Sequence, residues 1–525
     1  MTETLKRTVG TPWYGLLAAC GFRHAIAAPA LAVILSAIPG SANAGAPATS
    51  GRLPEPGDST VAAGAGSTLL LAEQGNVAAQ DSLGRSYATG HGVTRDDSTA
   101  VTWVRRAAEQ GYPAAQYNLG VMYDDGRGVA RDDSAAVAWY RLAAEQGYAE
   151  GQHELGVLYA YGRGVPRDDA EAVKWFRRAA EQGVAAAQCD LGVMYEKGRG
   201  VPQDDAEAVK LYRSSADQGF AAGQTNLGSM YQRGRGVPPN DAEALQWIRK
   251  AAEQGYPEAQ TNLGVAYGKG RGVPQNYAEA LKWFLAGAAQ GSADAQFNIG
   301  FMYEKGRGVP PDSAAAVKWY RKAARQGNAA AQCELGLMYE KGGGVPRDNA
   351  EAVRWYRKAA EQGYAAAQFD LGEMYTYGHG VPQDYAAAAR WYRKAADQGD
   401  AAAQTNLGAK YHFGQGVPQD DAAALEWYRK AAVQGDAVAQ QNLAWMYAQG
   451  RGVAQDDAVA VKWFRKAAEQ GYAAAQTGLG VMYEQGRGVP RDHAEAVKWF
   501  RKAAVQGDPD ARHLLDLMRG QGGAR

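Results

Sequence analysis

A block of 36 residues recurs twelve times in register along this chain, between Asn76 and Gly507 of its 525 residues. The copy at 184–219 reads VAAAQCDLGVMYEKGRGVPQDDAEAVKLYRSSADQG. Its Leu-Gly pair is kept in every copy but two, where Ile-Gly and Leu-Ala replace it. A fixed period of this length is typical of solenoids, in which each unit buries its apolar face against the next. The repeat therefore overrides the expectation, from length alone, of several separate globular domains.

Each block predicts two helices, which we term helix A and helix B. Helix B of one copy begins after Asp168, a favoured N-cap residue, and Glu171 follows three positions later as in a capping box. Apolar residues then recur at helical spacing up to Gly183, which suits the left-handed turn that ends many helices. Helix A follows and stops at Gly198, and Gly192 inside it permits close approach of a neighbouring helix, at a cost of about 1 kcal/mol. The pattern predicts an all-α fold of helix-turn-helix units.

Eleven of the twelve copies place a Trp at one position of helix B, and Leu211 is the exception. A regular row of Trp rings is compatible with a carbohydrate platform. The rings share a face with regularly spaced Ala residues, however, so the pattern favours core packing. The loop valine, such as Val201, is kept in all twelve copies, and we expect it to reach the core as well.

The N-terminus has the features of a secretory signal. Basic residues precede an apolar run at 25–38, and an A-x-A sequence ends at Ala44. Pro29 interrupts the run, which is also too short for a transmembrane helix of about 20 residues. We expect cleavage after Ala44 and a periplasmic or secreted chain with no membrane span. The sequence LAAC ending at Cys20 resembles a lipobox, which would instead anchor the chain by a lipid, but a basic and then a second apolar segment follow it.

These features predict the domain organisation of the chain. A signal peptide at 1–44 precedes a flexible linker rich in Ala, Gly, Pro and Ser. Partial helices are expected to cover the two ends of the array. The predicted segments are 1–44 signal peptide, 45–67 linker, 68–75 partial capping helix, 76–507 twelve repeats, and 508–525 C-terminal capping helix and tail.

The predicted mature chain keeps two cysteines, Cys189 and Cys333. They occupy the same repeat position four repeats apart, so several helix pairs should separate them. A disulfide needs Cα atoms within about 7 Å, which this spacing forbids. Free thiols are expected, with an intermolecular bridge as the alternative.

The repeat skeleton A-x-x-x-L-G-x-x-Y-x-x-G-x-G-V-x-x-D-x-x-x-A-x-x-W-x-x-x-A-A-x-x-G closely resembles the Sel-1-like repeat family, which is related to tetratricopeptide repeats. The resemblance covers 76–507 and implies a right-handed superhelical α/α solenoid with an adaptor or scaffold role. One branch of that family is cysteine-rich and linked to β-lactam hydrolysis, but this chain lacks its paired cysteines. One copy carries the skeleton on Leu155, Gly156, Tyr159, Gly162, Gly164, Val165, Asp168, Ala172, Trp175, Ala179, Ala180 and Gly183.

No residue pattern in the chain indicates catalysis. The histidines are scattered and never form H-E-x-x-H, so we expect no metal site. The G-x-G of each loop follows no strand and does not continue into a phosphate-binding fingerprint, so we expect no cofactor. The formal net charge is zero and no basic stripe stands out, which argues against a nucleic-acid partner.

Residues that vary while the scaffold repeats are the best candidates for partner binding. On helix A these lie before and after the Leu-Gly pair, one and two turns apart on one face. Such positions read Tyr117, His153, Thr225, Phe297 and Gln441. Repeats nine to eleven depart most from the pattern, and aromatic side chains with a few charges are typical of binding hot spots. The predicted partner-binding residues are Phe369, Glu373, Tyr377, Lys410, which replaces a usual Met, His412, Phe413 and Trp445.

The sequence therefore predicts a secreted or periplasmic scaffold that binds protein or peptide partners, as an adaptor or regulator in the bacterial envelope. The alternative is an envelope factor that binds peptidoglycan or regulates cell-wall enzymes. A third possibility, a β-lactam-processing enzyme, follows only from the cysteine-rich branch.

Overall fold

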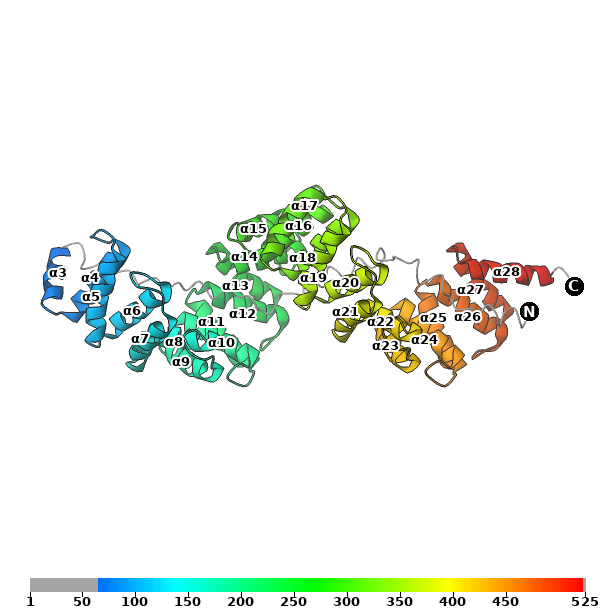
Figure 1. The fold of residues 1–525 in the computed structure, drawn as a ribbon, viewed down its shortest axis with the longest axis horizontal. Helices are drawn as coiled ribbons and strands as arrows, with labels where there is room; N and C mark the ends of the chain where they lie inside the picture. The colour runs from blue at the N-terminus through cyan, green and yellow to red at the C-terminus, as the bar shows by residue number, and fades with distance from the viewer. Residues whose placement is uncertain (1–64, 523–525) are drawn as a thin grey trace. The chain divides into compact units, whose positions relative to one another are not determined.

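The computed structural model describes residues 65–522, and within that range it contains 26 α-helices and no β-strand (Figure 1). The predicted all-α repeat fold is thereby confirmed. Residues 1–64 lie outside the described range, and with them the predicted signal peptide, its cleavage site after Ala44, the lipobox-like Cys20 and most of the predicted linker. No helix between residues 65 and 522 combines the length and apolarity that a membrane crossing requires.

Each repeat contributes one helix A and one helix B, which alternate along the chain. The helices A are α4 Val77–Thr89, α6 Pro113–Asp125, α8 Ala149–Tyr161, α10 Ala185–Lys197, α12 Ala221–Arg233, α14 Pro257–Lys269, α16 Ala293–Lys305, α18 Ala329–Lys341, α20 Ala365–Tyr377, α22 Ala401–Phe413, α24 Ala437–Gln449 and α26 Ala473–Gln485. The helices B are α5 Asp97–Glu109, α7 Asp133–Glu145, α9 Asp169–Glu181, α11 Asp205–Asp217, α13 Asp241–Glu253, α15 Tyr277–Ala289, α17 Ser313–Arg325, α19 Asn349–Glu361, α21 Tyr385–Asp397, α23 Asp421–Val433, α25 Asp457–Glu469 and α27 His493–Val505. Two further helices flank them, α3 Ala65–Glu73 and α28 Pro509–Gly522.

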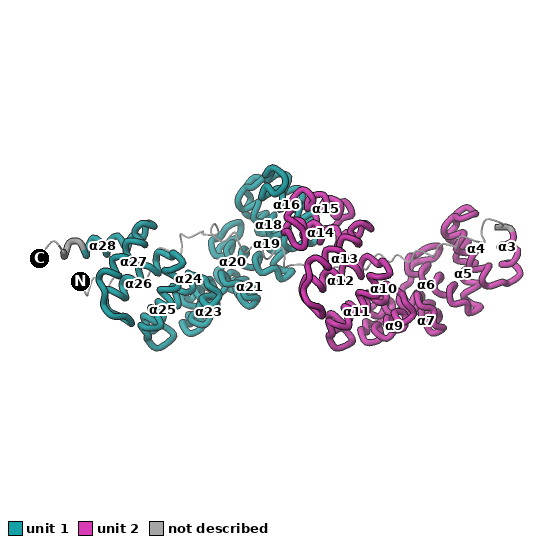
Figure 2. The backbone as a smooth tube through the Cα atoms, turned by 180° about the vertical axis from the view of Figure 1, so that it is seen from behind, with its two compact units in different colours: residues 1–34, 296–525 teal, residues 35–295 magenta. Residues whose placement is uncertain are grey.

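The described residues belong to two compact units, 65–295 and 296–522, which we term the N-terminal and C-terminal units (Figure 2). In the N-terminal unit α3 packs on α4, and in the C-terminal unit α28 packs on α27. Each array therefore has an extra helix against its terminal repeat, which removes an apolar face from water.

Helix B begins as the capping pattern predicts, with one difference. The Asp168 carboxylate accepts a hydrogen bond from the backbone N–H of Glu171 at 2.9 Å. In a full capping box the backbone N–H of Asp168 would donate to the Glu171 carboxylate. Here it donates to the carbonyl of Tyr159 at 3.0 Å. The Glu171 carboxylate binds Lys174 instead. The cap thus satisfies the helix start and also ties the loop back to helix A.

Helix B ends as predicted at a glycine in the left-handed region. Gly183 has φ 91°, and its N–H donates to the carbonyl of Ala180. The next residue, Val184, donates to Ala179, so two of the four orphan carbonyls of the helix end are satisfied.

A glutamine ladder, with no local signal in the sequence, ties helix A to both the preceding helix B and the helix B of its own repeat. The helix A residue Gln116 donates its amide to the carbonyl of Ala108 on the preceding helix B at 3.3 Å. Its own amide oxygen accepts from Gln146, which lies 30 residues later at the end of the next helix B, at 2.7 Å. The same Gln–Gln rung recurs in all twelve repeats. The ladder pairs polar groups that would be costly to bury alone.

The Leu-Gly glycine permits the close packing that its position predicts. A β-carbon on Gly192 would lie 2.7 Å from Cε1 of Tyr212, which is fully buried. An aromatic or branched side chain of helix B therefore fills the space that a helix A side chain would need. The loop valine Val201 packs partly buried against the same kind of core, as expected.

The Trp position of helix B is more exposed than the core prediction stated. Trp175, Trp427 and Trp499 are buried, but the other eight rings are half-buried. In most repeats a cation three residues later covers the outer face, as where Lys250 Nζ lies 4.1 Å from the Trp247 ring centroid. The rings therefore cover the edge of the core and do not lie at its centre.

Candidate functional site

The predicted partner-binding residues lie on three helices A of the C-terminal unit, α20, α22 and α24. Their exposure differs widely. The Phe369 and Lys410 side chains are buried, and the Tyr377 ring is exposed. The remaining four, Glu373, His412, Phe413 and Trp445, are half-buried. Only part of the predicted set can therefore touch a partner directly.

Phe369 and Glu373 meet at the same neighbour, Tyr392 of α21. The Phe369 and Tyr392 ring centroids are 5.8 Å apart. The Tyr392 hydroxyl donates to Glu373 Oε1 at 3.4 Å, and Asn406 of α22 donates to the same oxygen at 3.2 Å. Glu373 thus joins two helices by hydrogen bonds, which is a structural role.

Lys410 brings a positive charge to helix A of repeat ten, which lacks the loop arginine of most other repeats. In a typical repeat the loop arginine pairs with the first aspartate of the preceding helix B, as Arg199 does with Asp169 at 2.6 Å. In repeat ten the corresponding residues are Gln415 and Tyr385, which carry no charge. Lys410 Nζ instead donates to Gln415 Oε1 at 3.0 Å and lies 4.3 Å from the Tyr385 ring centroid. Burial lowers the pKa of Lys410 to about 8.

His412, Phe413 and Trp445 form a continuous group that we term the aromatic strip. The His412 ring lies 4.6 Å from Phe413 and 5.4 Å from Trp445, edge-on in both cases. His412 Nδ1 is held by Asp421 Oδ1 at 2.6 Å. The imidazole therefore fixes the relative position of two large aromatic side chains from neighbouring helices, α22 and α24.

The position two residues before Leu-Gly was predicted to face a partner, but in most repeats its side chain lies in the core. Tyr117, His153, Thr225 and Phe297 are all buried, and only Gln441 is half-buried. These side chains point at helix B, as where the Phe297 and Tyr320 ring centroids lie 5.6 Å apart. Variation at this position reflects repacking between helices and not solvent exposure.

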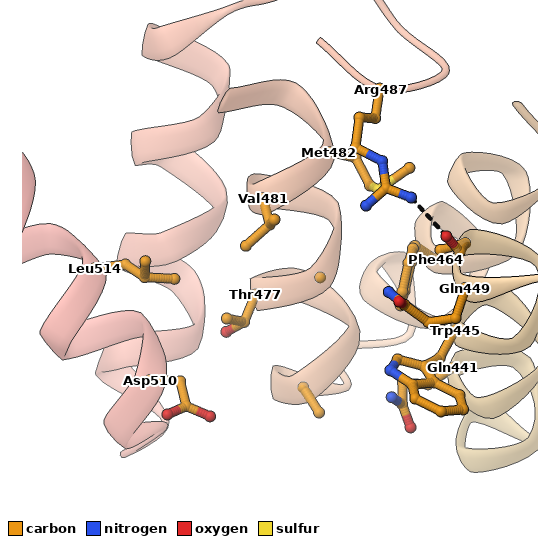
Figure 3. A pocket seen from close by; sticks show the side chains of 13 residues that line it. Gln441, Trp445, Gln449, Phe464, Thr477, Val481, Met482, Arg487, Asp510 and Leu514 are labelled. Atoms are coloured by element: carbon orange, nitrogen blue, oxygen red, sulfur yellow. Dashed lines mark hydrogen bonds between the residues drawn. The ribbon is translucent and has the colours of Figure 1, made fainter. Parts of the chain in front are cut away.

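A small cavity that the sequence did not predict lies next to Trp445 of the aromatic strip. It has a volume of about 40 Å³ and lies among α24, α25, α26 and α28 (Figure 3). Trp445 of the strip lines it from α24, Met482 and Val481 from α26, and Leu514 from α28. The walls are mostly apolar.

The cavity coincides with two missing rungs in a second inter-repeat ladder. In several other repeats the residue two before Leu-Gly pairs with the residue one before Leu-Gly of the next repeat. Asn118 thus donates to Asp81 at 2.8 Å. In repeat eleven the first residue of this pair is Gln441. Its partner position in repeat twelve is Gly478, which has no side chain to bond. Further examples of the pairing are His153 with Asp190, Asn226 with Cys189, and Cys333 with Asp370.

The next rung is lost at Thr477, whose partner position holds the apolar Leu514. Thr477 is 1% exposed, and its hydroxyl has no hydrogen-bond partner among the described residues. The equivalent Thr225 and Thr405 donate to the carbonyl four residues earlier at 2.8 and 2.9 Å. Thr477 therefore leaves an unpaired polar group in the wall of the cavity.

A buried histidine and the two cysteines, by contrast, have partners and act as scaffold. Burial alone would lower the pKa of His153, but hydrogen bonds to Asp190 at 2.8 Å and to Glu154 outweigh this effect and raise it to about 10. The two cysteines are buried and not joined in a disulfide with each other, and Cys189 accepts a hydrogen bond from Asn226. Within residues 65–522, no three His, Cys, Asp or Glu side chains gather as ligands of a metal ion would.

Comparison with sequence models and known structures identifies the repeat. A model of the Sel1 repeat matches twelve consecutive segments, from 77–112 to 473–508. The chain is also 39% identical to the crystallised protective antigen of uropathogenic Escherichia coli strains that displays an SLR fold, over 85% of this chain and 97% of that one, with a TM-score of 0.58. A Sel1 repeat protein from Oxalobacter formigenes is 38% identical, over 59% of this chain and 89% of its own, with a TM-score of 0.43. Among curated proteins no significant match was found.

Proposed function

Because this chain belongs to the Sel1 repeat family, we propose that it is a non-catalytic adaptor that binds a protein or peptide partner in the bacterial envelope. Sel1 repeat proteins generally serve as scaffolds for protein–protein interactions. The proposed binding surface is the part of the C-terminal unit around the aromatic strip, His412, Phe413 and Trp445.

The observation that carries this proposal is the aromatic strip itself. The strip holds two half-buried aromatic rings, Phe413 and Trp445, through His412, and Trp445 also lines a cavity. Aromatic side chains that are already fixed by their neighbours lose little entropy on binding and dominate the energetics of interfaces. The equivalent positions vary along the array, and no other pair of neighbouring repeats places three aromatic rings at them.

Export of the chain is the second part of the proposal. The basic start, the apolar run at 25–38 and the A-x-A sequence ending at Ala44 support a cleaved signal peptide. The similar Escherichia coli protein is described as a protective antigen, which fits an exported protein. Expression of the full chain in a bacterium, followed by fractionation and N-terminal sequencing, tests this point. A mature protein that begins at Gly45 in the periplasm or medium is expected, and an uncleaved chain in the cytoplasm would contradict it.

Partner binding is tested by crosslinking the exported chain in envelope extracts and identifying the captured species by mass spectrometry. The test variant is Phe413→Ala with Trp445→Ala, because both rings are accessible and neither fills the centre of the core. The matched control is Tyr161→Ala, which removes a 48%-exposed aromatic ring from α8 of the N-terminal unit. A protein captured by the wild type and the control but lost with the double variant is expected. Equal capture by all three chains would place the partner elsewhere.

Two other functions predict different results with the same purified chain. Retention on purified sacculi in the absence of other proteins would favour the peptidoglycan alternative. Turnover of nitrocefin would favour a β-lactam-processing enzyme, and we expect none.

A further inference from the structure

The helices B of the two units differ in charge, although the formal net charge of the whole chain is zero. The six helices B of the C-terminal unit, α17 to α27, contain eighteen lysine and arginine residues but only eight aspartate and glutamate residues. The six helices B of the N-terminal unit, α5 to α15, contain eleven and fourteen. No basic stripe was expected from the sequence, but the helices B of the C-terminal unit form one.

One position of helix B, three residues after the tryptophan, is a lysine in all six helices B of the C-terminal unit. We term these residues the lysine row: Lys322, Lys358, Lys394, Lys430, Lys466 and Lys502. In the N-terminal unit the same position holds Arg106, Leu142, Arg178, Ser214, Lys250 and Ala286. An unbroken row of cations at this position is therefore confined to the C-terminal unit.

All six lysines of the row are exposed, and none forms an ion pair with a carboxylate of the described residues. Each lies over the tryptophan ring three residues earlier, with its Nζ 4.0 to 4.3 Å from the ring centroid. By contrast, Lys174, Lys210 and Lys282 on helices B of the N-terminal unit each bind a glutamate three residues earlier. The row thus presents six positioned ammonium groups that can still donate to carboxylates.

The contacts between lysine and tryptophan limit the kind of anion that the row can bind. Proteins that bind single-stranded nucleic acids stack the bases on aromatic rings and also use positive charge. Here the lysine covers the outer face of each tryptophan, as Lys430 covers Trp427 at 4.0 Å, so neither a base nor a sugar ring has an open face to stack on. The row is therefore suited to a ligand that is recognised by its charge.

The path of the row favours a flexible ligand. The labels of α17, α19, α21, α23, α25 and α27 descend and then rise in Figure 1, so the helices B of the C-terminal unit follow an arc. A flat bilayer would contact only part of this arc, and a DNA duplex, with a persistence length of about 50 nm, would stay nearly straight. An extended polypeptide can follow the whole row.

Two exposed valines favour a peptide for a second reason. Val433 and Val505 are 68% and 88% exposed, and they lie three residues after Lys430 and Lys502 on the same helix faces. Ammonium groups with apolar side chains beside them fit a chain that carries carboxylates and some apolar residues. An extended peptide covers about 10 Å in three residues, which is the scale of the separation between packed helices. Carboxylates at about every third residue can thus reach successive lysines.

We propose that the lysine row binds an extended acidic segment of a protein partner, whose carboxylates pair with successive lysines. This surface lies on helices B, whereas the aromatic strip lies on the helices A α22 and α24. The inference therefore goes beyond the proposed function, because it gives the chain a second docking surface. Binding should weaken as the salt concentration rises, because exposed ion pairs are screened.

A model peptide tests the row without the unknown partner. The full chain is titrated into a fluorescein-labelled peptide of about 18 glutamates, long enough to reach six lysines, and binding is followed by fluorescence anisotropy at low and at high salt. The test variant combines Lys358→Gln, Lys394→Gln and Lys430→Gln. We expect it to bind the peptide about tenfold more weakly than the wild type, because three exposed ion pairs are lost.

Two further triple variants are the matched controls. Replacement of the same three lysines by arginine keeps both the charge and a cation over each tryptophan, so this variant should bind at least as tightly as the wild type. Lys174→Gln with Lys210→Gln and Lys282→Gln removes the same net charge from helices B of the N-terminal unit, and it should bind as the wild type does. Circular dichroism melting verifies that each variant is folded.

Several results would overturn the inference. They are a glutamate peptide that does not bind, unchanged binding by the folded glutamine variant of the row, and an equal loss in the N-terminal control, which would indicate net charge only. Tighter binding of polygalacturonate, single-stranded poly(dT) or phosphatidylglycerol vesicles than of the peptide would assign the row to another class of polyanion.

The aromatic strip is tested apart from the row. Phe413→Ala with Trp445→Ala should bind the glutamate peptide as the wild type does, and a loss in this variant would move the acidic site to the strip. Failure of the peptide to bind leaves the proposed function intact if partner capture still depends on Phe413 and Trp445. Peptide binding without such capture would support the lysine row and count against the strip.

Discussion

The ring of Phe464 occupies the place where a β-carbon of Gly478 would stand, with only 2.6 Å between that carbon and Phe464 Cε1. Gly478→Asn alone should therefore force the ring to move while Ala444, which replaces the glycine of the Leu-Gly pair, still blocks the other side, at a cost of about 1–3 kcal/mol in the free energy of unfolding. Ala444→Gly alone should cost about 1 kcal/mol, because glycine disfavours a helix interior.

The double variant tests whether the two substitutions are coupled. Once Ala444 is replaced by glycine, Phe464 can pack as the rings of other repeats do, so the cost at 478 should fall. We expect the double variant to be more stable than the sum of the single effects by about 1–2 kcal/mol, measured by urea unfolding. Additive effects would show that Phe464 does not link the two sites.

Lys410→Met should stabilise the chain, because methionine occupies the equivalent position in most helices A, for example Met374 and Met446. At pH 7 the lysine is charged and largely buried, and its removal should raise the free energy of unfolding by about 1–2 kcal/mol. Lys462→Met, which removes an exposed lysine from α25, is the control and should have little effect.

The advantage of Lys410→Met should depend on pH in a defined direction. The pKa of Lys410 is lowered to about 8 in the folded state, below its ordinary value of 10.5. The unfolded chain therefore binds more protons between these values, and wild-type stability gains with rising pH in this window. The difference between variant and wild type should be constant below about pH 8 and shrink towards pH 10.5. A difference that does not change with pH would contradict the buried charge.

His153 should give the opposite pH dependence. Its folded-state pKa is raised to about 10 by Asp190 and Glu154, above the ordinary value of 6.5. The stability that it contributes is therefore fully present below pH 6.5 and is lost as the pH rises towards 10. His153→Phe is a suitable comparison, because Phe297 fills the equivalent position of repeat seven. The stability difference between wild type and variant should fall over this window in urea unfolding at several pH values.

Thr477→Val should stabilise the chain by about 1 kcal/mol, because it removes a buried hydroxyl without a partner and keeps the shape of the side chain. Thr405→Val is the matched control. The Thr405 hydroxyl donates to Ala401 and to Asp436, so its loss should destabilise the fold. Opposite signs in thermal melting would confirm that the two hydroxyls differ, and equal signs would contradict it.

The fold could be predicted from the sequence because its determinants are local. The Asp168 cap, the Gly183 terminator and the close approach at Gly192 each depend on residue types at fixed short spacing. The glutamine ladder could not be foreseen in the same way, since its partners are 30 residues apart and the amides look like ordinary surface residues until the helices are packed.

The candidate site was predicted only in part, for a similar reason. Departures from the repeat pattern drew attention to α20, α22 and α24, but a departure does not reveal whether a side chain is exposed to solvent. Phe369 and Lys410 proved to be buried. The cavity had a sequence signal, an alanine gained at 444 and a side chain lost at 478, but its meaning depends on the ring of Phe464 that lies between them.

The glutamine ladder also bears on how such a chain changes over evolutionary time. Each Gln–Gln rung lies within one 36-residue block, and the bond across the junction joins a glutamine to a carbonyl eight residues earlier, so duplication or deletion of a whole block recreates both. The scaffold can therefore grow or shrink by single repeats. The pair formed by Ala444 and Gly478 spans two particular repeats and would be separated by an inserted copy. The packing of Phe464 between these two positions is thus a constraint on the order of repeats eleven and twelve.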